Sequence, residues 1–374
     1  MKSLLSVCLI LLAIGQSGYA QEPAPGVRAA TNVRESQYPR ILPDNRVLFQ
    51  ITAPGASSVQ ISLGAIVDLK KQANGVWTGT TAPLTGGLHY YNLLIDSVAV
   101  ADPASEAFYS NRRMTSGIEI PYPERDYYAL KKVPHGDIRS NPYYSEATGE
   151  WRRMLVYTPP GYDLDPARSY PVLYLLHGGG EDERGWANQG KADRIMDNLL
   201  AAGQTEPMLV VMLDGNADIP AIEERYLEFF ETELINTAIP FVENTYRVKP
   251  GASNRALAGL SLGGMQTLFA GVRHSELFAY LGVFSSGWIL PDQQGIADHQ
   301  YSFMRDRTAE INANLKLFWI SMGGQEDIAY ANCRIMLSRY DALGIHYEYS
   351  ESPGGHSWPV WRHDLYRFAP QLFR

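Results

Sequence analysis

The N-terminal third of the chain has a hydrophobic period of two. From Tyr38 to about Ile118, short segments alternate apolar and polar residues, which predicts strands with one buried face. Turn-forming pairs such as Asp44-Asn45 and Asn74-Gly75 separate these segments. Strands at this spacing predict a small all-β, immunoglobulin-like sandwich over residues 38–118. The predicted strands are Val47–Thr52, Ser58–Leu63, Gly75–Thr80 and Leu88–Ile95.

The period changes after a short Pro-containing linker at residues 119–124. From Arg125 to Arg374, short apolar runs alternate with segments of helical period. Uninterrupted apolar runs are typical of strands buried on both faces, so the alternation predicts an α/β domain with a mostly parallel sheet and helices on both faces. The predicted strands are Trp151–Tyr157, Val172–Leu176, Met208–Leu213, Ala256–Leu260, Tyr280–Phe284, Leu315–Met322 and Tyr347–Ser352. The predicted helices are Ala192–Ala202, Glu223–Tyr246, Met265–Val272 and Ala329–Leu343.

A serine flanked by glycines lies where one of these strands passes into a helix. The segment Gly259-Leu-Ser-Leu-Gly263 follows an apolar run and precedes Met265–Val272. Glycines on both sides of the serine suit a turn so sharp that a Cβ has no room. This arrangement is typical of the nucleophile elbow of α/β-hydrolases. It predicts Ser261 as the nucleophile and the backbone amide of Leu262 as an oxyanion donor.

A glycine-rich turn follows the predicted strand Val172–Leu176. The segment His177-Gly-Gly-Gly180 can direct backbone N–H groups toward the edge of the sheet where ligands bind. We predict Gly179 as the second oxyanion donor, with Gly178 as the alternative. His177 is interpreted as a residue that shapes this loop beside the substrate pocket.

The acid and the base of a catalytic triad are predicted after the last two strands. The turn Gly323-Gly-Gln-Glu-Asp327 offers two carboxylates, Glu326 and Asp327, and we favour Asp327. The turn that ends at His356 contains Gly354-Gly355, a flexible loop that can bring an imidazole over Ser261. The order serine, acid, histidine is that of α/β-hydrolases.

Further features of the sequence argue against some cofactors and partners and suggest residues of the substrate pocket. The chain has no H-E-x-x-H sequence, no cysteine pair at metal-ligand spacing and no G-x-G-x-x-G sequence, so neither a metal nor a cofactor is predicted. A formal net charge of −8 without a basic tract argues against nucleic acid as a partner. Trp288, Trp358 and Tyr162 are candidate aromatic walls of the substrate pocket, or else members of the core.

The N-terminus has the pattern of a secretory signal peptide. Lys2 precedes an apolar stretch and a small-residue cleavage site near Ala20, which predicts a signal peptide at residues 1–20 and a flexible leader at 21–37. Export to the periplasm or the medium is therefore expected. Removal of the signal peptide would leave Cys333 as the single cysteine, so no intramolecular disulfide is expected. No later segment is long and apolar enough to predict a membrane span.

Several motifs together resemble one family. The segments Leu175-Leu-His-Gly-Gly-Gly180, Ala258-Gly-Leu-Ser-Leu-Gly-Gly264 and Gly355-His-Ser-Trp-Pro359 are similar to those of the esterase D family, within it the carbohydrate esterase family 1 branch of feruloyl and acetyl-xylan esterases. This resemblance covers residues 125–374. The preceding module is similar to the early-set β-sandwich related to glycogen-binding modules.

The resemblance implies a serine esterase that releases ferulate or acetate from arabinoxylan, with feruloylated or acetylated xylan oligosaccharides as substrate. It leaves open an acetyl-xylan esterase without feruloyl activity and a siderophore esterase of the enterochelin type. A glycan-binding protein with an inactive hydrolase scaffold is disfavoured by the intact catalytic set. The sandwich either binds glycan through Trp77, Tyr90 or Tyr91 or shapes the esterase cleft, and we favour the second role. Whether the protein is a homo-oligomer is not decided by the sequence.

Overall fold

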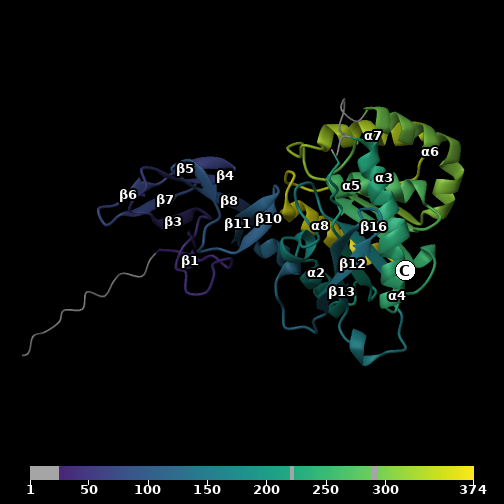
Figure 1. Cartoon of the computed structure of the whole chain (residues 1–374), viewed down its shortest axis with the longest axis horizontal. Helices are drawn as coiled ribbons and strands as arrows, with labels where there is room; N and C mark the ends of the chain where they lie inside the picture. The colour runs from purple at the N-terminus through teal and green to yellow at the C-terminus, as the bar shows by residue number, and fades with distance from the viewer. Residues whose placement is uncertain (1–24, 220–222, 289–293) are drawn as a thin grey trace, which may run out of the picture.

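A computed structural model describes residues 25–219, 223–288 and 294–374. The predicted signal peptide and the first four residues of the predicted leader lie outside these ranges. Figure 1 shows an N-terminal β-rich body beside a larger body of strands and helices. Among the described residues, no helix is both long enough and apolar enough to cross a membrane.

The N-terminal body is a sandwich of two antiparallel sheets. The alternation predicted from the sequence is confirmed in β4, where Val59, Ile61 and Leu63 are buried and the residues between them are partly exposed. Phe49 and Tyr91 meet edge to face in the core between the sheets. One sheet has the order β1 (Val27–Arg28), β2 (Arg40–Ile41), β3 (Val47–Thr52), β7 (Val76–Thr80), β6 (Lys70–Lys71). The other has the order β10 (Ala107–Ser110), β11 (Arg113–Ile120), β8 (Gly87–Ile95), β4 (Val59–Leu63), β5 (Ala65–Asp68), with β9 (Val98–Val100) paired to β8.

Two expected boundaries differ from the structure. Part of the predicted flexible leader is ordered, because β1 pairs with β2 and the guanidinium of Arg40 donates to the carbonyl of Pro25. The predicted linker begins inside β11 and continues into the short helix η1 (Pro123–Tyr128). Proline and polar residues interrupt both segments, so neither shows a hydrophobic period.

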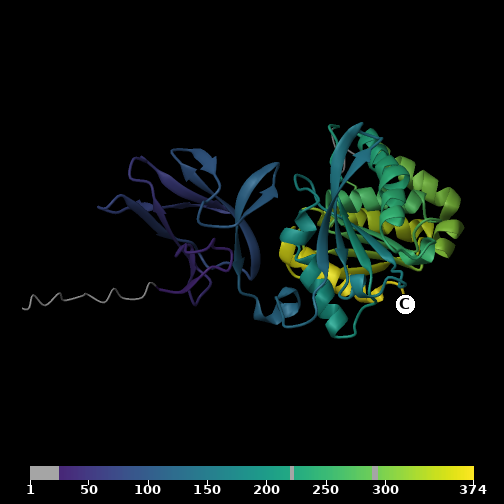
Figure 2. The same cartoon turned by 60° about the horizontal axis from the view of Figure 1, so that its bottom comes forward.

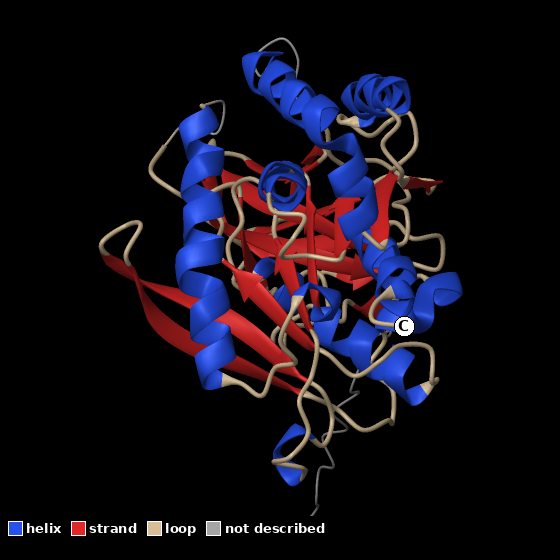
Figure 3. Cartoon of the chain, turned by 90° about the vertical axis from the view of Figure 1, so that its right-hand side faces the viewer, coloured by secondary structure: helices blue, strands red, loops and turns tan. Residues whose placement is uncertain are grey.

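The larger body contains an eight-stranded sheet with helices on both faces (Figure 3). Strands β14 to β19 are parallel, and β12 and β13 form an antiparallel hairpin that joins the sheet through β15. The sheet order is β12 (Asp137–Ser145), β13 (Glu150–Thr158), β15 (Leu209–Leu213), β14 (Val172–Leu176), β16 (Arg255–Leu260), β17 (Tyr280–Phe284), β18 (Leu317–Met322), β19 (Glu348–Glu351). The central strands are buried along almost their whole length, which confirms the prediction from their apolar runs.

The helices lie between these strands in the chain. The predicted helices Ala192–Ala202 and Ala329–Leu343 correspond to α2 and α7. The predicted helix Glu223–Tyr246 is divided by the π-helical turn η3, and Met265–Val272 corresponds to the end of α5 and the π-helical turn η5. Neither α6 nor α8 was predicted from the sequence. The helical elements are α1 (Gly185–Asn188), α2 (Ala192–Ala201), α3 (Glu224–Glu233), η3 (Leu234–Ala238), α4 (Ile239–Thr245), α5 (Leu262–Gln266), η5 (Thr267–Gly271), α6 (Gln294–Asn314), α7 (Tyr330–Leu343) and α8 (Trp358–Phe368), with the short turns η2 (Tyr162–Leu164), η4 (Ala252–Asn254) and η6 (Ala369–Gln371).

The two bodies are joined by buried polar contacts as well as by the chain. Arg362 on α8 is fully buried and donates to both carboxylate oxygens of Glu119 on β11, at 2.8 and 3.0 Å. It also donates to the carbonyl of Gln189. A buried arginine with a bidentate carboxylate partner fixes orientation as well as distance. Figures 1 and 2 show β10 and β11 on the side of the sandwich that faces the larger body.

Candidate active site

Ser261 lies in a strained turn between β16 and α5. Its φ of 51° and ψ of −117° are unusual for a residue with a side chain. The turn is held by two hydrogen bonds, from the Ser261 amide to the carbonyl of Phe284 at 2.9 Å and from the Ser286 hydroxyl to the Ser261 carbonyl at 2.7 Å. A Cβ on Gly259 would lie 2.4 Å from the carbonyl of Gly263, so this close approach requires glycine.

The structure brings Ser261, His356 and Asp327 together. His356 Nε2 lies 2.9 Å from Ser261 Oγ, and His356 Nδ1 lies 2.9 Å from Asp327 Oδ1. Because a carboxylate can only accept, Nδ1 carries the proton and Nε2 is free to accept the proton of the serine hydroxyl. All three residues follow the carboxyl ends of parallel strands, namely β16, β18 and β19.

Asp327 rather than Glu326 faces the histidine. The Asp327 side chain is buried, whereas Glu326 is exposed. Burial alone would raise the pKa of Asp327, but the hydrogen bond from His356 and a second one from the Ala329 amide outweigh it and lower that pKa. Asp327 is therefore ionised and can stabilise a cationic imidazole.

Two backbone amides lie free beside the serine. Within the described ranges, neither the amide of Leu262, the first residue of α5, nor that of Gly179 has a hydrogen-bond acceptor. The two residues are neighbours, since a Cβ on Gly179 would lie 3.8 Å from a Leu262 methyl group. The Gly178 amide instead points toward the carboxylate of Glu181, at 3.4 Å. The geometry thus favours Gly179 over Gly178 as the second donor.

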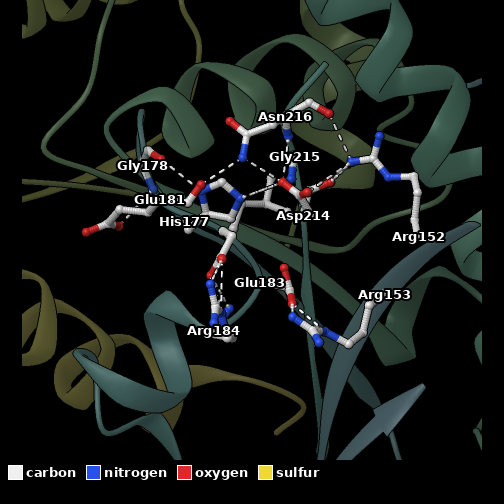
Figure 4. A network of polar contacts seen from close by, with 12 residues as sticks. Arg152, Arg153, His177, Gly178, Glu181, Glu183, Arg184, Asp214, Gly215 and Asn216 are labelled. Atoms are coloured by element: carbon white, nitrogen blue, oxygen red, sulfur yellow. Dashed lines mark hydrogen bonds and ion pairs between the residues drawn. The ribbon is translucent and has the colours of Figure 1, made fainter. Parts of the chain in front are cut away.

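His177 holds the glycine-rich loop against the neighbouring strand end. Its Nε2 accepts from the Gly215 amide at 3.0 Å, so Nδ1 carries the proton and donates to the Gly178 carbonyl at 2.8 Å (Figure 4). The ring is buried, and it is not among the residues that line the pocket at Ser261. The structure therefore places His177 beneath the loop, where it supports the backbone.

Glu181 is a buried carboxylate that connects three parts of the site. Its Oε1 accepts from the hydroxyl of Tyr90, on the sandwich, and from the indole of Trp358, both at 3.0 Å. Its Oε2 accepts from the Gly178 amide. Burial raises the pKa of Glu181, although its hydrogen bonds partly offset the effect. The sequence analysis missed this residue, whose one signal was its place directly after His177-Gly-Gly-Gly180.

A pocket of about 390 Å³ opens at Ser261 and His356 between the two bodies. Trp358 and Trp361 form its aromatic wall, and the Trp361 ring packs edge-on against the imidazole of His356 at 5.0 Å. The opposite wall belongs to the sandwich. The sandwich residues that line the pocket are Leu63, Gly64, Leu88, His89, Tyr90, Ser110 and Asn111.

Two predicted pocket residues lie elsewhere. Trp288 is buried in the core of the larger body, and Tyr162 is buried in η2 between Tyr170 and Tyr246. Neither lines the pocket at Ser261. Of the three aromatic residues proposed from the sequence, the structure brings only Trp358 to it.

A second buried carboxyl group lies near Asp327. Asp364 on α8 is 1% exposed, and burial together with the charge of Asp327 raises its pKa to about 8. An unfolded aspartate titrates near pH 3.9, so folded Asp364 binds its proton more tightly than the unfolded chain does. The stability that the folded state gains from this tighter proton binding is complete below about pH 4 and is lost as the pH rises through about 8.

Asp364→Asn should remove this pH dependence, because asparagine has the shape of the protonated acid and does not ionise. The difference in melting temperature, variant minus wild type, should be several degrees larger at pH 8.5 than at pH 5. Thermal unfolding followed by circular dichroism measures it, with the exposed Asp306→Asn as control. A difference that stays constant over this range would contradict the assignment.

Comparisons with known proteins agree with this geometry. Residues 145–372 match the family described as "Putative esterase". The Endo-1,4-beta-xylanase/feruloyl esterase of Xylanibacter ruminicola is 36% identical over 351 residues, which cover 90% of this chain. This chain spans 46% of that relative's length.

Two solved structures bear on the fold. A feruloyl esterase module from Clostridium thermocellum complexed with sinapinate aligns with a TM-score of 0.57 and 26% identity, covering 72% of this chain and 97% of its own. Enterochelin esterase from Shigella flexneri aligns with a TM-score of 0.66 and 17% identity, covering 88% of this chain and 92% of its own. The second likeness concerns the fold alone. The family match includes Ser261, Asp327 and His356, and the chain belongs to this esterase family.

Proposed function

We propose that the protein is a serine carboxylic-ester hydrolase that releases ferulate from feruloylated xylan. The observation that carries the proposal is the pair of 2.9 Å contacts that link Ser261, His356 and Asp327 beside two free amides. In this arrangement a neutral histidine can deprotonate the serine at the moment of attack, and its charge is compensated by a buried carboxylate.

The reaction proceeds in two acyl transfers. Ser261 Oγ forms a bond to the ester carbonyl carbon while its proton passes to Nε2 of His356. The tetrahedral oxyanion accepts hydrogen bonds from the Leu262 and Gly179 amides, a stabilisation that contributes about 3–4 kcal/mol per donor in comparable sites. Collapse breaks the bond to the alcohol oxygen, which takes the proton from His356. Water then attacks the acyl carbon, His356 takes its proton and returns it to Oγ, and the carboxylic acid leaves.

The pocket supports an aromatic acyl group. A volume of about 390 Å³ beside Trp361 and Leu88 leaves room for an aromatic ring, whereas an acetyl group would fill little of it. The names of the relatives point the same way, since two of them are feruloyl esterases and one was solved with the phenolic acid sinapinate. Export is proposed as well, because a polysaccharide substrate lies outside the cell.

A siderophore esterase is the second candidate. The enterochelin esterase structure covers more of this chain than the feruloyl esterase module does, 88% against 72%. The wider coverage shows a shared fold, but at 17% identity the likeness gives no information about the substrate of this chain.

Substrate comparison tests the proposal. We expect the wild-type protein to release ferulate from methyl ferulate faster than it releases acetate from acetylated xylan, because the pocket matches the larger acyl group. Chromatographic product assays measure both rates, and Ser261→Ala should abolish them. Release of acetate alone would make the protein an acetyl-xylan esterase. Hydrolysis of a catecholate siderophore ester alone would favour the second candidate.

The two adjacent carboxylates provide a matched test of the acid. Asp327→Asn should lower kcat on methyl ferulate by about a thousandfold to ten-thousandfold, because the histidine loses the partner that fixes its tautomer and stabilises its charge. Glu326→Gln, an exposed neighbour, should change kcat by less than about threefold. Steady-state kinetics of both variants on methyl ferulate measure these changes in kcat. Equal losses, or a larger loss in Glu326→Gln, would contradict the role of Asp327.

A further inference from the structure

A polar groove extends from the candidate active site along the edge of the sheet. One hollow of about 480 Å³ adjoins a second of about 710 Å³, and the two share Glu183, Asp214 and Asn216 among their lining residues. We call the two hollows together the lateral groove. It lies beyond the carboxyl ends of β14 and β15 and reaches the β12–β13 hairpin.

The lateral groove adjoins the pocket at Ser261. Glu181 lines both, and the turn of the β10–β11 hairpin separates them, with Asn111 on the pocket side and Arg112 on the groove side. The Arg112 amide donates to the Gly180 carbonyl at 2.9 Å, which holds the turn on the glycine-rich loop. A ligand whose ester lies at Ser261 would cross over this turn to reach the groove.

The polar groups of the groove are held in place before any ligand binds (Figure 4). Asn216 donates to the Asp214 carboxylate at 2.6 Å and to the Glu181 carbonyl at 2.7 Å. Arg152 donates to the carbonyl of Asn216 at 2.9 Å. Groups fixed by such bonds lose little entropy when they accept or donate a hydrogen bond to a ligand.

The charges of the groove are partly compensated within it. Arg153 donates to Glu183 at 2.6 Å, and Arg152 lies 3.8 Å from Asp214. Carboxylates outnumber guanidinium groups along the lining, with Glu150, Glu181, Asp182, Glu183, Asp214 and Asp218 against Arg112, Arg152 and Arg153. Such a surface repels a polyanion, and its carboxylates can accept hydrogen bonds from a neutral ligand rich in hydroxyl groups.

Two groups in the groove have their polar or aromatic surface available to a ligand. The guanidinium of Arg112 makes no hydrogen bond or ion pair within the described ranges. At the far end, the indole of Trp151 is 73% exposed and touches Tyr144 edge to face at 5.8 Å. On β13, Met154 pairs with Leu213, the last residue of the antiparallel strand β15. Trp151 lies three residues before Met154, so it extends beyond the carboxyl end of β15. Exposed tryptophan and arginine are the side chains that most often dominate recognition surfaces.

We propose that the lateral groove binds the neutral sugar chain that carries the ester, with Arg112 donating to its hydroxyl groups and Trp151 stacking on a sugar ring. The inference rests on the proposed ester hydrolysis at Ser261 and extends it to the polysaccharide part of the substrate. It assigns a binding role to β12–β13 and to the hairpin turn of the sandwich.

A comparison of large and small substrates tests the groove. For Trp151→Ala and Arg112→Gln, the ratio of kcat/KM on feruloylated arabinoxylan to kcat/KM on methyl ferulate should fall about five- to tenfold, as loss of an aromatic or arginine anchor predicts. Leu164→Ala is the matched control, because Leu164 is 88% exposed and follows the opposite end of β13. Its ratio should equal that of the wild type. Unchanged ratios in both groove variants would overturn the proposal.

A binding experiment separates this inference from the proposed chemistry. Soluble arabinoxylan cast into a native gel should retard the Ser261→Ala protein, and Trp151→Ala in that background should remove most of the retardation. If the wild type cleaved no ferulate ester but retardation depended on Trp151, the proposed function would fail and the groove would stand. Absence of retardation in Ser261→Ala, or equal retardation with and without Trp151, would contradict the groove. Circular dichroism confirms that each variant is folded.

Discussion

The turn at Ser261 combines a backbone conformation that costs about 1–3 kcal/mol with packing too close for side chains on its glycine neighbours. The cost is offset by buried structure on either side, where β16 and α5 are held by hydrogen bonds to β17 and the residues after it. The consequence is that the Ser261 hydroxyl is presented at the sheet edge and the first turn of α5 directs an amide beside it. The glycine-rich loop approaches because Gly263 leaves room for the carbonyl of His177.

A second constraint is that residues of both bodies form the site. The carboxylate of Glu181 accepts hydrogen bonds from the sandwich, from the glycine-rich loop and from Trp358, two residues after His356. A buried carboxylate with these donors is stable only while all three parts remain in place. The Arg362–Glu119 pair fixes the same interface from its other side. The sandwich is thereby positioned as a wall of the pocket, in agreement with the role favoured for it from the sequence.

Local patterns predicted most of the strands and the order of the candidate catalytic residues, because both depend on short stretches of chain. Apolar runs located β14 to β18 almost to the residue, and glycines located the turns that present Ser261 and His356. Contacts between distant segments were not predictable in this way. Tyr90 and Glu181 are 91 residues apart, and nothing around either one indicates the other.

Aromatic residues show the same limit. From the sequence, Trp288, Trp358 and Tyr162 could each be a wall of the pocket or a member of the core, yet only Trp358 lines the pocket and the other two lie in the core. The sequence favoured Gly179 over Gly178 as the second donor but showed no physical reason for the choice. The reason is the Glu181 carboxylate, which accepts from the Gly178 amide and leaves the Gly179 amide free.

If Ser261 is the nucleophile of a covalent acyl transfer, a reagent that labels activated serines should modify it. Diisopropyl fluorophosphate forms a bond between an activated serine Oγ and phosphorus, with loss of fluoride. We expect one adduct per chain in the intact mass, mapped by peptide analysis to the segment that contains Ser261, and no adduct in Ser261→Ala. A label on another serine, or a wild-type protein that remains unlabelled, would contradict this role of Ser261.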